Sequence, residues 1–157
     1  MNVLHVLHVF VAVCAGLRAG GNMLIHFGVN RITAHYTAGN YVHWLQDEVG
    51  TIGPYMGITG LLTLASAVVT LLAGRVIGTL SAGLTLVGIL GSVADILITL
   101  RGNVPINHVF SAATAEQPPA NWELLRKRWQ DRHALRTVAT FLAFLAYVLA
   151  ASTAGLK

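Results

Sequence analysis

Four long apolar runs constrain this chain more than any other feature of its sequence. They cover about residues 3–27, 52–73, 76–100 and 135–154. A helix needs roughly 20 apolar residues to cross the ~30 Å hydrocarbon core of a bilayer. Charged residues make up only 10% of the chain, whereas soluble domains carry about a quarter. We therefore expect an all-α, four-transmembrane-helix bundle that forms a single integral membrane domain over residues 1–157.

The connections between these runs predict where the polar chemistry gathers. A tight turn at Gly74 and Arg75 joins the second and third runs, which predicts an antiparallel helical hairpin. The two long connections, about residues 28–51 and 101–134, then emerge on the same side of the membrane. Because they hold most of the Lys and Arg residues, the positive-inside rule places these loops in the cytoplasm and both termini outside. We predict a bacterial inner membrane as the location.

Polar side chains recur along one face of the first apolar run. They follow helical spacing from His8 through Asn22 to His26, and Arg18 lies in the same stripe. A buried charge that faces lipid costs several kcal/mol, so this face is expected to point into the bundle. Asp95 is the only acidic residue within any of the runs. We predict an Arg18–Asp95 ion pair, which either fixes helix packing or takes part in substrate or proton chemistry.

Histidines are the main candidates for catalysis. His26 lies near the loop-side end of the first run, where His108 and His133 are expected to be its neighbours. Imidazole titrates near neutral pH, so His26 and His133 are predicted as catalytic bases, and the three histidines together are candidate metal ligands. An ordinary interfacial hydrogen bond is the alternative for each. Apart from a histidine-bound metal, which the sequence leaves open, no cofactor is expected.

The stretch Asn103-x-Pro105-x-Asn107 follows directly on the third run. Pro105 is predicted to end that helix, because proline disfavours helical geometry in the residue before it. The two asparagines then either satisfy the backbone groups freed at the helix end or bind an oxygen of a ligand.

A short amphipathic interfacial helix is predicted just before the last span. Asn121 suits its N-cap, and residues 122–133 place Trp129 and His133 on one face. This face is either an aromatic belt at the membrane surface or the cap of a pocket with Arg136 below it. The candidate substrate-binding residues are Asn103, Asn107, His108, Trp129 and Arg136.

Two signatures carry a resemblance to a known family. The patterns Asn103-x-Pro105-x-Asn107 and Trp129-x-x-x-His133-x-x-Arg136, with the layout of the spans, resemble the anthrone oxygenase-like family of small four-helix membrane proteins, long catalogued mostly as a domain of unknown function. This chain differs from the family pattern at His133, where the pattern usually has Asn. The resemblance implies oxidation of the central carbon of a tricyclic phenolic anthrone to a quinone by dioxygen, without flavin or haem.

The leading functional hypothesis is a membrane-embedded oxidoreductase or oxygenase that acts with dioxygen on a lipophilic aromatic substrate, anthrone-like or quinol-like. The alternative is a non-catalytic four-helix membrane protein, such as an assembly partner, small-molecule binder or transporter subunit. The expected partners are the lipid bilayer and a lipophilic aromatic molecule, and a homo-oligomer is left open. No nucleic-acid motif is present, so no nucleic-acid partner is expected. A hydrophobic pocket beneath the loops would favour the enzyme if at least two of the following residues faced it: His26, Asn103, Asn107, His133 and Arg136. A tightly filled core would favour the alternative.

Overall fold

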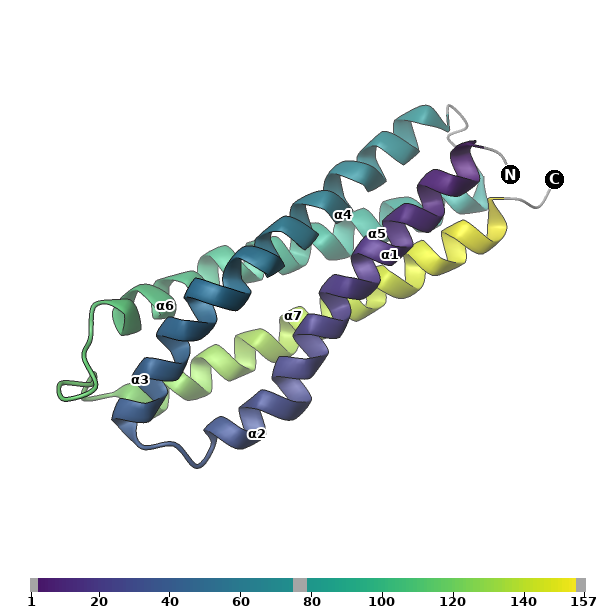
Figure 1. The fold of residues 1–157 in the computed structure, drawn as a ribbon. Coiled ribbons are helices and arrows are strands. Elements are labelled where there is room, and N and C mark those ends of the chain that lie inside the picture. The colour runs from purple at the N-terminus through teal and green to yellow at the C-terminus, as the bar shows by residue number, and fades with distance from the viewer. Residues whose placement is uncertain (1–2, 75–78, 155–157) are drawn as a thin grey trace.

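The computed structural model describes residues 3–74 and 79–154, and these form a bundle of four long helical segments (Figure 1). All four are long and apolar enough to cross a membrane, which confirms the predicted fold class. Three of the four are interrupted by a π-helical turn, labelled η. In chain order the elements are α1 (Val3–Leu24), η1 (Ile25–Val29), α2 (Asn30–Thr33), α3 (Ala38–Asp47), η2 (Glu48–Ile52), α4 (Gly53–Ala73), α5 (Leu80–Ile98), η3 (Thr99–Asn103), α6 (Val104–Ser111) and α7 (Trp122–Thr153).

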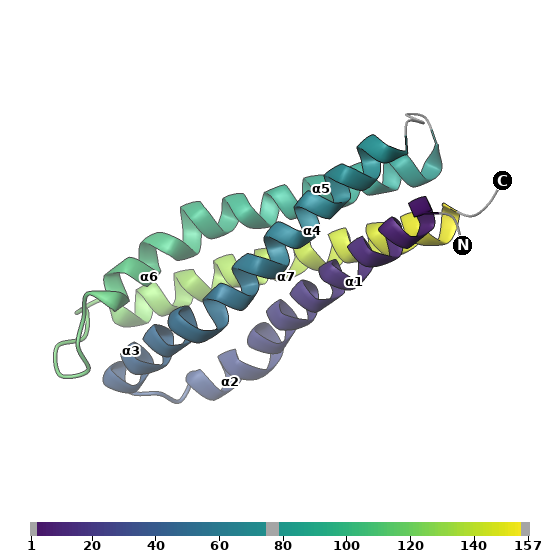
Figure 2. The same cartoon turned by 45° about the horizontal axis from the view of Figure 1, so that its top comes forward.

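The long helices form a ring in which each packs against two neighbours. Helix α1 packs against α4 and α7, and α5 packs against α7 and α4. The start of α1, the end of α4, the start of α5 and the end of α7 lie at one end of the bundle, and α2, α3 and α6 lie at the other (Figures 1 and 2). We call these the terminal end and the loop end. The predicted turn at Gly74 and Arg75 falls largely on residues 75–78, outside the described residues.

The helical segments are longer than the predicted spans. They contain 31, 36, 32 and 32 residues, or about 46 to 54 Å at 1.5 Å per residue, which exceeds a ~30 Å hydrocarbon core. The regions expected as loops, 28–51 and 101–134, are therefore mostly helical extensions of the spans. In each segment, about 20 residues from the terminal end are enough to span the hydrocarbon core. Residues about 20 positions from that end therefore lie at the same level in all four segments. The residues at this level are Asn22, Gly53, Thr99 and His133.

Two prolines follow π-helical turns instead of ending helices. Pro105 was predicted to terminate the third span, but it lies in the first turn of α6, directly after η3. Pro54 occupies the same place in α4, directly after η2. A proline is tolerated in the first turn of a helix because its missing N–H has no intrahelical acceptor there. The π-helical turn resets the hydrogen-bonding register, so the chain continues as helix past each proline.

The predicted interfacial helix is the beginning of α7. Residues 122–153 contain neither glycine nor proline, so nothing interrupts the helix between the amphipathic part and the last span. Trp129 and His133 share an inward face and are each 1% exposed. An aromatic belt at the membrane surface is therefore wrong for Trp129, which lies in the interior.

A hydrophobic cluster closes the loop end of the bundle. Its buried members come from η1, α3, α6 and α7: Ile25, Tyr41, Val42, Leu45, Ile106, Phe110 and Trp129. Polar contacts join these elements, since Nε2 of Gln46 donates to the carbonyl oxygens of Phe110 and Ala113 at 2.9 and 3.0 Å. Arg126 lies over the ring of Trp122, with 4.8 Å from its Cζ to the ring centroid. We call this cluster the aromatic cap, and it lies beyond the layer that contains Asn22 and His133.

Candidate functional site

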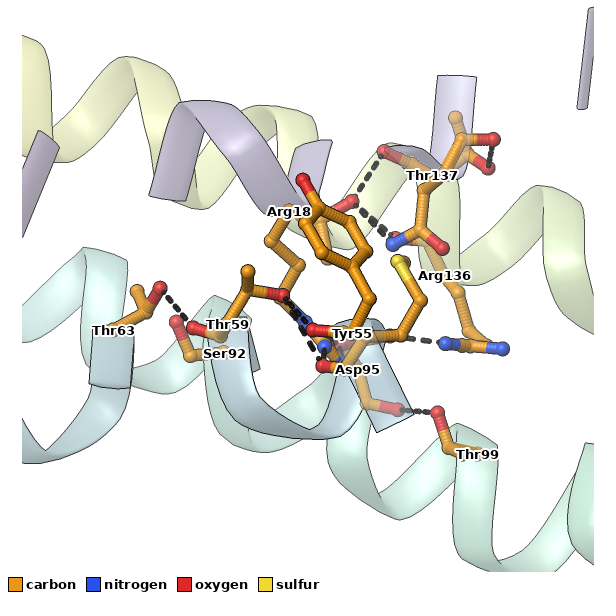
Figure 3. A network of polar contacts seen from close by, with 12 residues as sticks. Arg18, Tyr55, Thr59, Thr63, Ser92, Asp95, Thr99, Arg136 and Thr137 are labelled. Carbon is orange, nitrogen blue, oxygen red and sulfur yellow. Dashed lines mark hydrogen bonds and ion pairs between the residues drawn. The ribbon is translucent and has the colours of Figure 1, made fainter. Parts of the chain in front are cut away.

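A buried carboxylate between two arginines lies at the centre of the bundle (Figure 3). Asp95 from α5 is completely buried and accepts hydrogen bonds from Arg18 of α1 and Arg136 of α7. Nε of Arg18 lies 2.7 Å from Oδ2, and Nε of Arg136 lies 2.9 Å from Oδ1. Arg18 and Asp95 thus make the contact that the sequence predicts, and Arg136 is a second partner. This arrangement ties three helices together in the interior of the bundle.

The space for the Arg18 guanidinium is created by a glycine. A Cβ built on Gly60 of α4 would lie 2.6 Å from Nη1 and 2.8 Å from Cζ of Arg18. The same guanidinium donates from Nη1 to the backbone carbonyl of Met56, so it is held on two sides. Two arginines against one aspartate leave a net charge of +1 in this cluster. A buried excess charge of this kind calls for an additional anion nearby, because desolvating an unpaired ion is costly.

A polar cavity of about 210 Å³ adjoins this cluster, and the π-helical turns η2 and η3 contribute to its lining. π-Helical turns within longer helices are frequent at functional sites. The cavity lies at the level that the spans reach about 20 residues from the terminal end. Its polar lining residues come from all four helical segments: Arg18, Asn22, Glu48, Thr99, Asn103, Asn107, His133 and Arg136.

His133 lines this cavity and has an unpartnered ring nitrogen. Its Nε2 lies 3.1 Å from the backbone carbonyl oxygen of Asn22. A carbonyl can only accept, so Nε2 carries the hydrogen, and in the neutral ring Nδ1 is then an acceptor. Nδ1 is buried and has no hydrogen-bond partner among the described residues. The imidazole is held in place by the Trp129 indole, which is stacked parallel to it at 5.0 Å between ring centroids.

Two asparagines present unpartnered oxygens in the same way. Asn22 donates from Nδ2 to Thr140 at 3.1 Å, and Asn103 donates from Nδ2 to the carbonyl of Trp129, also at 3.1 Å. The Oδ1 atoms of both side chains are buried without a partner in the described part of the chain. Buried polar atoms are normally paired, so these three unpartnered acceptors on residues of one small cavity need an explanation. We call them the orphan acceptors: Nδ1 of His133 and the Oδ1 atoms of Asn22 and Asn103. A ligand that donates hydrogen bonds would satisfy them.

The cavity also brings together a cation, Arg136, and a carboxylate, Glu48, that are not paired with each other. Arg136 uses Nε for Asp95, and no hydrogen bond from its terminal nitrogens is found within residues 3–74 and 79–154. Glu48 of η2 lies close enough to Arg136 for an electrostatic interaction, but the two form no direct ion pair in the described structure. The cavity therefore offers free N–H donors on one side chain and a free carboxylate on another.

The structure groups five of the predicted site residues and separates two. Asn103, Asn107, Trp129, His133 and Arg136 all line the cavity. Asn107 accepts a 2.8 Å hydrogen bond from the indole Nε1 of Trp129, so it also holds that ring.

His26 and His108 lie elsewhere. His26 is not among the lining residues and packs edge-on against Phe27. His108 is exposed to solvent. In the described ranges, no three His, Cys, Asp or Glu side chains form a group that could hold a metal ion. The three histidines therefore form no metal site among the described residues, and His108 lies apart, whereas His26 is close enough to His133 for an electrostatic interaction.

Three polar lining residues were not predicted as site residues. Asn22 lies in the polar stripe of the first span, so its inward position could have been read as a site signal. Glu48 and Thr99 carried no such signal, because each lies in a π-helical turn that the sequence pattern does not reveal. Glu48 in particular was placed in the long connection of about residues 28–51, between the first two apolar runs.

The fold and the cavity together define a class: a four-helix membrane bundle with a buried polar cavity. A family model described as anthrone oxygenase matches residues 50–146, which is more than half of the chain. The chain therefore belongs to the anthrone oxygenase family. No curated protein and no solved structure matches it.

Proposed function

We propose that this protein oxidises a lipophilic phenolic aromatic compound of the anthrone type with dioxygen, and that the reaction takes place in the polar cavity. The observation that carries the proposal is the lining itself: three orphan acceptors, the free terminal nitrogens of Arg136 and the unpaired carboxylate of Glu48. Phenolic hydroxyl groups are hydrogen-bond donors and match the orphan acceptors. The family membership favours this chemistry over a non-catalytic bundle.

The reaction needs no co-reactant other than dioxygen. A base removes a proton from the methylene carbon opposite the anthrone carbonyl, which gives an electron-rich enolate. The enolate is oxidised by dioxygen to a hydroperoxide at that carbon. Loss of the second proton from the carbon, with cleavage of the O–O bond, gives the new carbonyl and one molecule of water. One anthrone and one dioxygen thus yield one quinone and one water.

In this proposal Glu48 is the base. Protonation turns its carboxylate into a neutral acid, whereas protonation of His133 would create a second cation close to Arg136. A like charge nearby disfavours the charged form, so the electrostatics of the cavity favour the carboxylate. His133 instead accepts a hydrogen bond at Nδ1. An asparagine, which the family pattern usually carries at this position, offers an equivalent acceptor.

Arg136 stabilises the enolate. Its terminal N–H groups are free while Asp95 fixes its Nε, so the guanidinium is oriented before substrate arrives. A preorganised donor aimed at developing negative charge contributes about 100- to 1,000-fold to a rate in comparable sites. Asn22 and Asn103 hold the phenolic hydroxyls at their Oδ1 atoms.

The membrane location fits a substrate of this kind. A flat aromatic molecule concentrates in the bilayer, and the cavity lies near the boundary of the hydrocarbon core by helix length. The proposed orientation keeps the loop end in the cytoplasm, following the distribution of Lys and Arg. A homo-oligomer stays a prediction from the sequence.

The proposal is tested with purified protein in lipid nanodiscs and dithranol, a dihydroxylated anthrone, as the substrate. Quinone formation by absorbance and oxygen uptake by electrode should exceed the rate in empty nanodiscs. The stoichiometry should be one dioxygen consumed per quinone formed, without hydrogen peroxide. A rate equal to that of empty nanodiscs would favour the non-catalytic alternative.

A further inference from the structure

A second hollow lies on the outer face of the bundle between α1 and α4. It has a volume of about 740 Å³, and its lining is apolar apart from a tyrosine; it includes Leu17, Gly20, Leu24, Ile25, Ile52 and Tyr55. Leu17 and Leu24 are 52% and 67% exposed, so this side of α1 points away from the helix bundle. In a chain that crosses the membrane, such a surface faces lipid. We call this hollow the lateral groove.

One residue lines both the lateral groove and the polar cavity. Ile25 lines both hollows and is itself only 2% exposed. It is the first residue of η1, and Ile52, which also lines the groove, is the last residue of η2. Both walls of the groove therefore include a π-helical turn, where the regular hydrogen-bonding pattern of the α-helix is interrupted.

The polar cavity is too small to hold a multi-ring substrate by itself. Its volume of about 210 Å³ is below the ~300–1,000 Å³ of pockets that enclose drug-sized ligands. The aromatic cap covers the loop end of the bundle with fully buried side chains such as Tyr41 and Phe110. The lateral groove, which shares Ile25 with the cavity, supplies additional volume on the membrane side.

We propose that the lateral groove is the membrane-side entrance and binding site for the apolar rings of a flat, multi-ring phenolic substrate, with Ile25 as the gate to the cavity. The central ring and one outer ring pass Ile25 and reach the orphan acceptors, so that the reacting methylene carbon meets Glu48, while the other outer ring stays in the groove. The inference rests on the proposed function for the identity of the ligand. It predicts that affinity depends on the groove only when the ligand has more rings than the cavity can hold.

Two glycines provide a matched pair of variants. A Cβ added at Gly20, on the groove wall, or at Gly83, on α5, would meet no atom within 4 Å, and both positions are exposed. Replacing glycine with leucine within a helix is favourable for helix formation, so both variants should fold. Gly20→Leu fills the groove with a side chain, whereas Gly83→Leu places the same side chain on a part of the surface outside both hollows.

The experiment measures ligand binding in nanodiscs by saturable quenching of tryptophan fluorescence. The probes are dihydroxyanthraquinone, with three rings, and hydroquinone, with one ring and two phenolic hydroxyls. Gly20→Leu should weaken binding of the three-ring probe by about tenfold or more and leave the one-ring probe within about twofold of wild type. Gly83→Leu should leave both within about twofold. The inference would be overturned if Gly20→Leu bound the three-ring probe as tightly as wild type does, or if wild type did not bind that probe.

Turnover of dithranol by the same proteins separates this inference from the proposed function. If wild type binds the three-ring probe through the groove but does not oxidise dithranol, the groove site stands and the proposed reaction falls. If Gly20→Leu oxidises dithranol with the KM of wild type, the reaction stands and the groove is not its entrance.

Discussion

Asp95 holds Arg136 through a 2.9 Å hydrogen bond from Nε to Oδ1, and it binds Arg18 through its other carboxylate oxygen. A single fully buried carboxylate thus orients both arginines of the cavity lining. If the proposed function holds, Asp95 connects the two roles that the sequence left as alternatives for this ion pair, helix packing and substrate chemistry.

Replacing Asp95 with asparagine should strongly destabilise the protein. The change leaves two buried guanidinium groups without a counter-charge, and breaking a buried ion pair in this way typically costs about 3–5 kcal/mol. Thermal unfolding in detergent would measure the loss. Asp131→Asn is the matched control, because Asp131 pairs with Lys127 on the surface, where both side chains are more than half exposed. The control should change stability by less than about 1 kcal/mol. Equal effects of the two substitutions would show that the buried pair does not stabilise the bundle.

Arg136→Lys should reduce turnover more than stability. Lysine keeps the positive charge, but its single ammonium group cannot bind Asp95 and also present two free nitrogens to the cavity. We expect kcat for dithranol to fall about 100- to 1,000-fold, the range for losing one preorganised donor. Arg128→Lys on the exposed side of α7 serves as the control and should keep the wild-type kcat. A wild-type kcat for Arg136→Lys would remove this residue from the proposed chemistry.

Glu48→Gln should abolish most of the activity while the protein still binds ligand. Glutamine has nearly the same shape as glutamate but cannot take up the proton, and loss of a general base costs about 100- to 10,000-fold in rate. Binding of dihydroxyanthraquinone, which needs no proton transfer, should stay within about threefold of wild type. Glu123→Gln, at an exposed position of α7, should leave kcat unchanged. If Glu48→Gln turns over dithranol normally, another group is the base.

The sequence predicted the layout of the bundle better than the shape of its site. The apolar runs and the polar stripe of the first span placed Arg18, Asn22 and Asp95 inside the bundle, and they are all buried. Loops were wrongly expected near Glu48 and Pro105, because glycine and proline are common in loops as well as beside π-helical turns. Where a helix passes through such a turn, the following side chains rotate about the axis, and this rotation cannot be read from a regular 3.6-residue period.

The three candidate histidines illustrate the same limit. Their positions along the chain suggested that they would converge at the loop end, but His108 is exposed and only His133 lines the cavity. The depth of a residue follows from counting along a helix. The direction in which its side chain points around the helix depends on any π-helical turn at or before it. His26 lies within η1, and His108 lies after η3.

His133→Asn should have a much smaller effect than Glu48→Gln. Asparagine retains an acceptor at this position and is the residue that the family pattern usually carries there. We expect kcat to fall by less than about tenfold, whereas His133→Leu, which removes the acceptor and the 3.1 Å contact with the Asn22 carbonyl, should lower it further. Steady-state rates with dithranol distinguish the two variants. A loss with His133→Asn as large as with Glu48→Gln would instead assign the base to the histidine.

Oxygen-isotope transfer is the most direct test that the cavity oxidises its substrate with dioxygen. Wild type and Glu48→Gln in nanodiscs would be supplied with dithranol under oxygen-18 gas, and the quinone analysed by mass spectrometry over time. We predict that wild type forms quinone with one labelled oxygen atom, faster than empty nanodiscs do, and that Glu48→Gln falls to nearly the background rate. Unlabelled quinone, or labelled quinone formed by wild type no faster than by empty nanodiscs, would contradict the account.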